Sequence, residues 1–162
     1  MRSLRRPPPA VPVGPGERLL AWATAGSGEV LAGTRDALYV GARRIPWEEV
    51  EAADWDRDTS LFRVCEVGHW GEQRVEHALA LDDPDRLLQL VRERVTASVV
   101  LVRHVPLEGR RGVRVVARQA PGRRGPLTWV HEYDEGIDPD DPLVQITADE
   151  LLRASREEVG LG

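Results

Sequence analysis

The amino-acid sequence predicts an α+β fold in which strands and helices are segregated along the chain. Short apolar or alternating segments fill most of the first half, and one amphipathic segment at 83–95 follows them. A second group of strands then precedes a helix near the end of the chain. Parallel α/β folds alternate strands with helices, so an order of seven strands, a helix, three strands and a helix argues against that class.

The first group of strands is predicted from short apolar runs separated by turn residues such as those at 24–28. Two of these strands alternate in polarity. In 50–56 we expect one face to hold Val50, Ala52 and Asp54, and in 61–67 one face to hold Phe62, Val64 and Glu66. The segment between them, 56–60, is typical of a hairpin turn. The expected strands are 17–23, 29–34, 37–40, 44–46, 50–56, 61–67 and 73–81.

A helix is predicted over 83–95. Asp83 is a suitable N-cap and Pro84 a suitable first helical residue. Its apolar residues recur at helical spacing and form one stripe, made by Leu87, Leu88, Val91 and Val95. We therefore expect this helix to cover the open end of a curled antiparallel sheet formed by the preceding strands.

The second half contains three further expected strands, 99–105, 113–117 and 127–133, joined by turns at 106–112 and 121–126. An acidic loop with two prolines, 134–142, follows them. Thr147 and Glu150 have the spacing of a capping box, which predicts that the last helix begins there. Gly160 is a suitable stop for it.

Composition is that of an ordinary globular protein, with 162 residues, 41% hydrophobic and 30% charged, and a net charge of −5. No apolar run approaches the length needed to span a bilayer, and no apolar stretch follows the arginines at the N-terminus. We expect a cytoplasmic protein whose residues 1–16 form a disordered arm, extended at Pro7–Pro9. All 22 basic residues are arginines, which the codon bias of a high-GC genome explains.

Charge is distributed in blocks along the chain. Net charge is +3 over 1–16, −6 over 17–95, +6 over 96–130 and −8 over 131–162. The basic block contains an arginine-rich hairpin, 110–124, with Arg110, Arg111, Arg114, Arg118, Arg123 and Arg124. Guanidinium groups suit phosphate or carboxylate. On the next strand, stacking surface for a single-stranded nucleic acid is offered by Trp129, His131 and Tyr133. The alternative is internal pairing of these arginines with the acidic C-terminal segment, with the aromatic residues in the core.

No catalytic or metal-binding motif is present in the sequence. Cys65, His69 and His77 lack the four-ligand local spacing of a structural zinc site, and the acidic loop lacks EF-hand spacing. Cys65 has no partner for a disulfide, and its strand position favours packing over a nucleophilic role. We therefore expect no metal, no cofactor and no enzymatic activity.

Two segments resemble the bacterial pleckstrin-homology-like (PH-like) domains of high-GC actinobacteria. These are 28–40, which is similar to an early hairpin of that family, and 45–50, which the Trp55 strand follows. Seven strands closed by one amphipathic helix is also that family's plan. The resemblance implies a bent antiparallel barrel with a capping helix over 17–97. A three-stranded meander and a C-terminal helix, 98–162, would then pack on this barrel.

The resemblance implies a binding or scaffolding module. The family's phosphoinositide site does not carry over, because the matching loop at 24–28 has no basic residue. We expect a non-catalytic protein-interaction module, with a protein partner or self-association. The alternative is an anionic-ligand or nucleic-acid binder that uses the arginine-rich hairpin.

Overall fold

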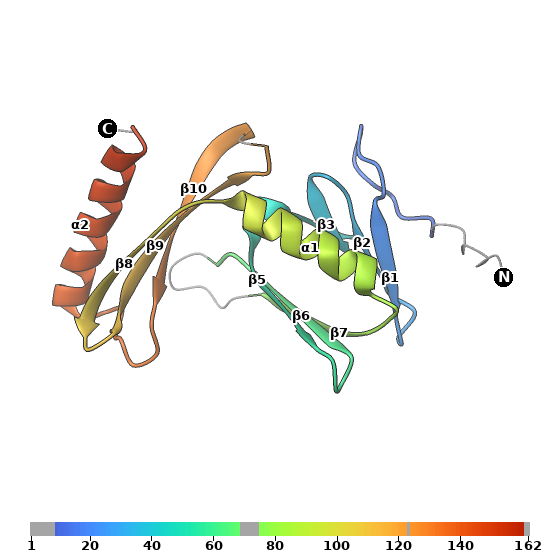
Figure 1. The fold of residues 1–162 in the computed structure, drawn as a ribbon, viewed down its shortest axis with the longest axis horizontal. Coiled ribbons are helices and arrows are strands. Elements are labelled where there is room, and N and C mark those ends of the chain that lie inside the picture. Colours follow the sequence, from blue (N-terminus) through green and yellow to red (C-terminus); the bar gives the residue numbers. More distant parts are fainter. Residues whose placement is uncertain (1–8, 69–74, 123, 161–162) are drawn as a thin grey trace. The chain divides into compact units, whose positions relative to one another are not determined.

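Two groups of strands, each followed by a helix, make up the computed structural model, which describes residues 9–68, 75–122 and 124–160 (Figure 1). The chain divides into two compact units. The first contains the chain up to residue 97 together with 120–122, and the second contains 98–119 and the chain from residue 123 onward. The predicted α+β class and the order of seven strands, a helix, three strands and a helix are confirmed.

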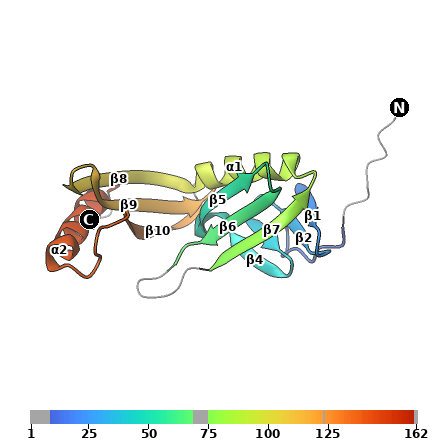
Figure 2. The same ribbon diagram turned by 90° about the horizontal axis from the view of Figure 1, so that it is seen from below.

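The first unit is built on one seven-stranded sheet in which the paired strands run antiparallel. Its strands lie in the order β4-β3-β2-β1-β7-β6-β5, so the hydrogen-bonded ladder is open and β4 and β5 are its end strands. Figure 2 shows β5, β6 and β7 side by side. The strands are β1 (Ala21–Ala25), β2 (Val30–Gly33), β3 (Ala37–Val40), β4 (Arg43–Pro46), β5 (Val50–Asp56), β6 (Leu61–Glu66) and β7 (Glu76–Asp82).

Strand β5 departs from the strict alternation that its sequence predicts. Its pairing with β6 shifts between Val50 and Ala52, as in a β-bulge. Because of this shift, the buried Val50 and the later Ala53 and Trp55 all pair with residues of the buried face of β6. That face consists of Phe62, Val64 and Glu66, as predicted.

Helix α1 (Asp85–Ser98) packs on the inner face of this sheet (Figure 1). Leu87, Leu90 and Val91 are buried in one hydrophobic core with residues from all seven strands, whereas Leu88 and Val95 are only partly buried. The apolar stripe is therefore wider than the sequence analysis assigns, since it includes Leu90.

The start of α1 differs from the prediction. Asp83 has φ of 44°, a left-handed conformation rather than the extended one of an N-cap. Helical hydrogen bonding begins with the bond from Leu88 N to Pro84 O at 2.8 Å. Asp83 lies in the bend between β7 and α1, and the first helical residue is Asp85.

A segment that precedes β1 covers part of the opposite face of the sheet. Val11, Val13 and Leu19 pack against a second, smaller apolar cluster of Ala32, Ala37 and Tyr39. Residues 1–8 of the predicted N-terminal arm lie outside the described residues, whereas Val11 and Val13 contact the sheet because their apolar side chains find this cluster.

The second unit contains a three-stranded sheet in the order β10-β9-β8 and helix α2. Its strands β8 (Val99–Glu108), β9 (Arg111–Ala120) and β10 (Arg124–Tyr133) are longer than predicted. The predicted turn at 106–112 is instead the end of a hairpin, because Glu108 pairs with Arg111 and Pro106 pairs with Gly112. Pro106 is tolerated because β8 is an edge strand. A Cβ on Gly112 would lie 1.8 Å from Val105 O, so only glycine fits opposite it.

Helix α2 (Pro142–Glu158) begins six residues earlier than the capping box predicts, since Thr147 as N-cap would make Ala148 the first helical residue. Asp141 is the N-cap, and its side chain accepts a 2.8 Å hydrogen bond from Leu143 N. Thr147 lies within the helix and donates to Leu143 O. The capping-box prediction is wrong because an aspartate followed by proline is a stronger start signal. Gly160 follows the C-cap with φ of 80°, as a helix stop requires.

Among the residues that the structure describes, neither helix is long and apolar enough to cross a membrane.

Candidate functional site

The arginine-rich hairpin places its exposed arginines at and next to the β8–β9 turn. Arg110 is exposed, and Arg111 lies 3.9 Å from the Glu108 carboxylate and donates to Glu135 O at 3.4 Å. On β9, Arg114 forms an ion pair with Glu132 of β10 at 3.7 Å. Arg118 is buried, with 5% of its surface exposed. Arg123 lies outside the described residues, and Arg124 begins β10.

The aromatic residues of β10 face helix α2. His131 Nε2 lies 3.1 Å from Ala148 O, and the Arg156 guanidinium stands 5.9 Å from the centre of the Trp129 ring. Burial, with a smaller contribution from Asp149, raises the pKa of Tyr133. The face that the sequence analysis assigns to base stacking is therefore the face on which α2 packs.

Acidic side chains in the second unit pair with several of its basic groups. Arg103 Nε donates to Glu158 at 3.0 Å, and His104 lies 2.8 Å from Asp134. Hydrogen bonds from Gly112 N and His104 hold the pKa of Asp134 below its usual value. The internal pairing that the sequence analysis gives as the alternative is thus present for part of the basic block.

Two residues that the sequence analysis considers as metal ligands, His77 and Cys65, have other surroundings in the structure. His77 Nε2 lies 2.7 Å from the Glu66 carboxylate, and Cys65 is partly buried on β6 opposite Ala52. His69 lies outside the described residues. Over 9–68, 75–122 and 124–160, no three or more histidine, cysteine or acidic side chains are placed to hold a metal ion.

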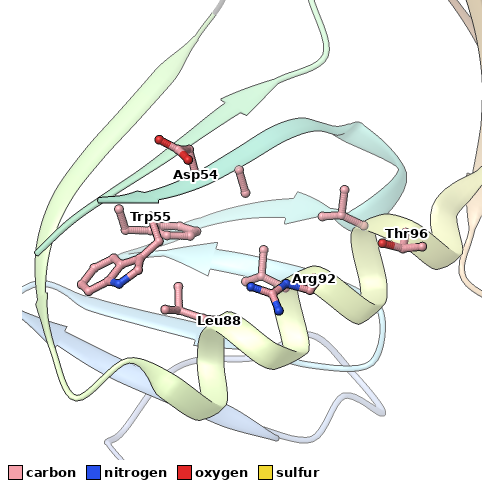
Figure 3. A pocket seen from close by; sticks show the side chains of 9 residues that line it. Asp54, Trp55, Leu88, Arg92 and Thr96 are labelled. Atoms are coloured by element: carbon pink, nitrogen blue, oxygen red, sulfur yellow. The ribbon is translucent and has the colours of Figure 1, made fainter. Parts of the chain in front are cut away.

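A pocket of about 400 Å³ lies between β5, β6 and α1 in the first unit (Figure 3). Its floor is apolar, because Phe62 and Val91 are buried there, and its rim carries polar side chains. Figure 3 shows Trp55 and Leu88 near each other on the two walls, with Arg92 one turn further along the helix. The lining residues are Ala53, Asp54, Trp55, Phe62, Leu88, Val91, Arg92, Val95 and Thr96.

One wall of this pocket is a sheet edge. Strand β5 pairs with β6 on one side and is the last strand of the seven-stranded order. Ala52, Ala53 and Asp54 in its middle are exposed. An edge strand presents a row of backbone N–H and C=O groups that can pair with another chain. The pocket and the edge together form a groove, which we call the β5–α1 groove.

Sequence reasoning missed this groove, although one signal for it exists. Leu87, Leu88, Leu90, Val91 and Val95 make an apolar stripe wider than one buried face needs. Leu88, Val91 and Val95 are the members that line the pocket. The bulge in β5, which turns Ala53 toward the same pocket, leaves no mark in the sequence.

Comparison with models of known protein families finds no match for this chain. A search of curated proteins finds no significantly similar sequence.

Proposed function

We propose that this protein is a non-catalytic, PH-like interaction module that binds an extended segment of a partner protein in the β5–α1 groove. Seven antiparallel strands followed by one helix on their inner face support the PH-like assignment. The bent shape is supported by the 2.6 Å ion pair between Arg43 of β4 and Glu66 of β6, which stand near opposite ends of the strand order.

The observation that carries the proposal is the coincidence of an edge strand with a pocket that has an apolar floor and a polar rim. When a peptide adds to a sheet edge, backbone hydrogen bonds supply affinity and pockets for alternate side chains supply specificity. Strand β5 offers the backbone hydrogen-bonding groups, and the space between Trp55 and Leu88 offers the side-chain pocket. A volume of about 400 Å³ is in the range of sites that enclose small ligands, enough for an apolar side chain.

The polarity of the pocket supports binding rather than catalysis. Active sites bring polar groups together at the bottom of a cavity, where water is excluded. Here Asp54, Arg92 and Thr96 are exposed at the rim, while the floor consists of Phe62 and Val91.

A random library of displayed twelve-residue peptides tests the proposal. Peptides selected on the wild-type protein should lose at least tenfold in affinity for Ala53→Phe, because a ring at Ala53 fills the pocket from an exposed strand position. The matched control is Ala78→Phe, which makes the same change at an exposed position of β7 that does not line the pocket. Failure to select any peptide, or selection of peptides that bind Ala53→Phe unchanged, would refute the proposal.

A further inference from the structure

We propose that the segment bound in the β5–α1 groove alternates apolar with basic residues, so that its apolar side chains enter the pocket and its arginines or lysines lie beside Asp54 on the opposite face. This inference rests on the proposed function, since it assigns a partner chemistry to the same groove.

The two faces of β5 differ in what they offer to an added strand. Ala53 and Trp55 pair with Val64 and Phe62 on the face toward the pocket. Asp54 also borders the pocket at its rim, but it pairs with Arg63 on the opposite face of the strand. Figure 3 shows Asp54 pointing away from α1 and Trp55 pointing toward it. Side chains of an added strand alternate in the same way, so every second residue of the partner faces the pocket.

The pocket face selects apolar side chains. Its floor is formed by buried residues, and the partly buried Leu88 and Val95 extend it along the helix. Arg92 is exposed at its rim, and its positive charge disfavours a second cation on this face. The inner row of the partner is therefore apolar.

The opposite face selects basic side chains. Asp54 is exposed and has Arg63 as its cross-strand neighbour on the β6 side, so its other side faces the edge at which β5 ends the described sheet. Opposite charges on directly facing strand residues attract, and like charges repel. Acidic residues dominate 47–58, and the one basic residue in this segment is Arg57. The acidic residues are Glu48, Glu49, Glu51, Asp54, Asp56 and Asp58.

The same charges argue against a second copy of this chain as the occupant. Pairing of β5 with its own copy would bring Glu51, Asp54 and Asp56 of both strands together. Turn hydrogen bonds from Thr59 and Asp58 lower the pKa of Asp56, so this group stays ionised at neutral pH. The acidic side chains of β5 attract a basic partner strand and so strengthen its binding, whereas they repel an identical strand.

Three fluorescein-labelled eight-residue peptides test the inference by fluorescence polarisation on the full chain. One alternates leucine with arginine, a second alternates leucine with glutamate, and a third has the composition of the first with four leucines followed by four arginines. The alternating leucine–arginine peptide should bind at least tenfold more tightly than the other two. Asp54→Arg should weaken it about tenfold, and Glu150→Arg, the same charge change on α2, should not.

The outcomes separate this inference from the proposed function. Suppose that the leucine–glutamate or block peptide binds equally well, or that Asp54→Arg has no effect, while Ala53→Phe still abolishes binding. The partner chemistry is then wrong and the groove remains a binding site. If binding of the peptides does not respond to Ala53→Phe, the proposed function fails too. A wild-type dimer that Ala53→Phe dissociates in sedimentation would identify a second copy as the occupant and overturn the inference.

Discussion

Glu17 and Glu66 look like ordinary surface acids in the sequence, yet the fold buries both carboxylates. The Glu17 side chain is 4% exposed and accepts hydrogen bonds from Tyr39, from Thr34 at 2.7 Å and from Gly14 N at 2.8 Å. Arg44 adds an ion pair at 3.2 Å. These contacts tie the segment before β1 to β3 and β4, so a single carboxylate anchors that segment.

Glu66 lies on the inner face of β6. Its carboxylate is 2.6 Å from the Arg43 guanidinium and 2.7 Å from His77 Nε2. Hydrogen bonding from Arg43 lowers the pKa of Glu66, although burial alone would raise it. The alternation of β6 predicted that Glu66 shares a face with Phe62 and Val64. Its partners come from β4 and β7, which a pattern within one strand does not reveal.

Glu17 should make stability depend on pH. Burial raises the pKa of Glu17, but hydrogen bonds from Tyr39, Arg44 and Thr34 outweigh it and lower the pKa to about 2. Because the folded-state pKa lies below the unfolded value, its contribution is complete above about pH 4.5 and is lost as pH falls toward 2. We expect Glu17→Gln to lower the free energy of unfolding by about 3 kcal/mol at pH 7.

Urea denaturation at pH 7, 5 and 3 measures this difference, with Glu150→Gln on exposed α2 as the control. The gap between wild type and Glu17→Gln should narrow at pH 3. A gap that stays constant with pH would mean that the charge of Glu17 does not contribute.

At the scale of elements, the start of α2 shows which local signal decides a helix boundary. Two candidate signals lie six residues apart, at Asp141 and Thr147. We expect Asp141→Ala to cost about 1 kcal/mol, because Leu143 N loses its acceptor. Thr147→Ala should change the free energy of unfolding by less than about 0.5 kcal/mol. Thermal unfolding of the two variants compares these changes. A larger loss of stability for Thr147→Ala than for Asp141→Ala would contradict the assignment of Asp141 as the N-cap.

Helix α1 contains neighbouring leucines with different roles. Leu87 is fully buried in the core, while Leu88 is partly exposed and lines the pocket. Leu87→Ala should therefore cost about 2–5 kcal/mol, and Leu88→Ala about 1 kcal/mol. Leu88→Ala should in turn weaken peptides bound in the groove, which chemical denaturation and polarisation measure separately. Equal losses of stability would contradict the orientation of α1.

Elements with strong periodicity are predictable from this sequence, and their boundaries and irregularities are not. Alternation located β6 and helical spacing located α1, because each pattern repeats over several residues. The bulge after Val50 changes the face of Ala53 without changing any residue type. The groove depends on that bulge and on the end position of β5 in the sheet, and strand order is a property of the whole fold.

At the scale of the whole molecule, the basic block at 96–130 and the acidic block at 131–162 lie within the same unit, apart from 96–97 and 120–122. Arg103 with Glu158 and Arg114 with Glu132 join the two blocks. This pairing leaves less positive charge for an external anion, and the net charge of −5 opposes nucleic acid.

We accordingly expect a labelled single-stranded DNA oligomer to bind more weakly than about 0.1 mM at physiological salt, the weak end of non-specific binding. Fluorescence anisotropy over a range of salt concentrations measures this. Micromolar affinity that falls steeply with salt and is lost in Arg110→Ala would instead restore the arginine-rich hairpin as the binding surface.

The most direct measurement of the central claim is amide hydrogen exchange of the full chain with and without a peptide selected from the displayed library. If the peptide adds to the edge of the sheet, amides of β5 gain protection, and amides at the pocket wall of α1 change with them. Protection confined to the arginine-rich hairpin, or no gain in β5 at a saturating peptide concentration, would contradict the account.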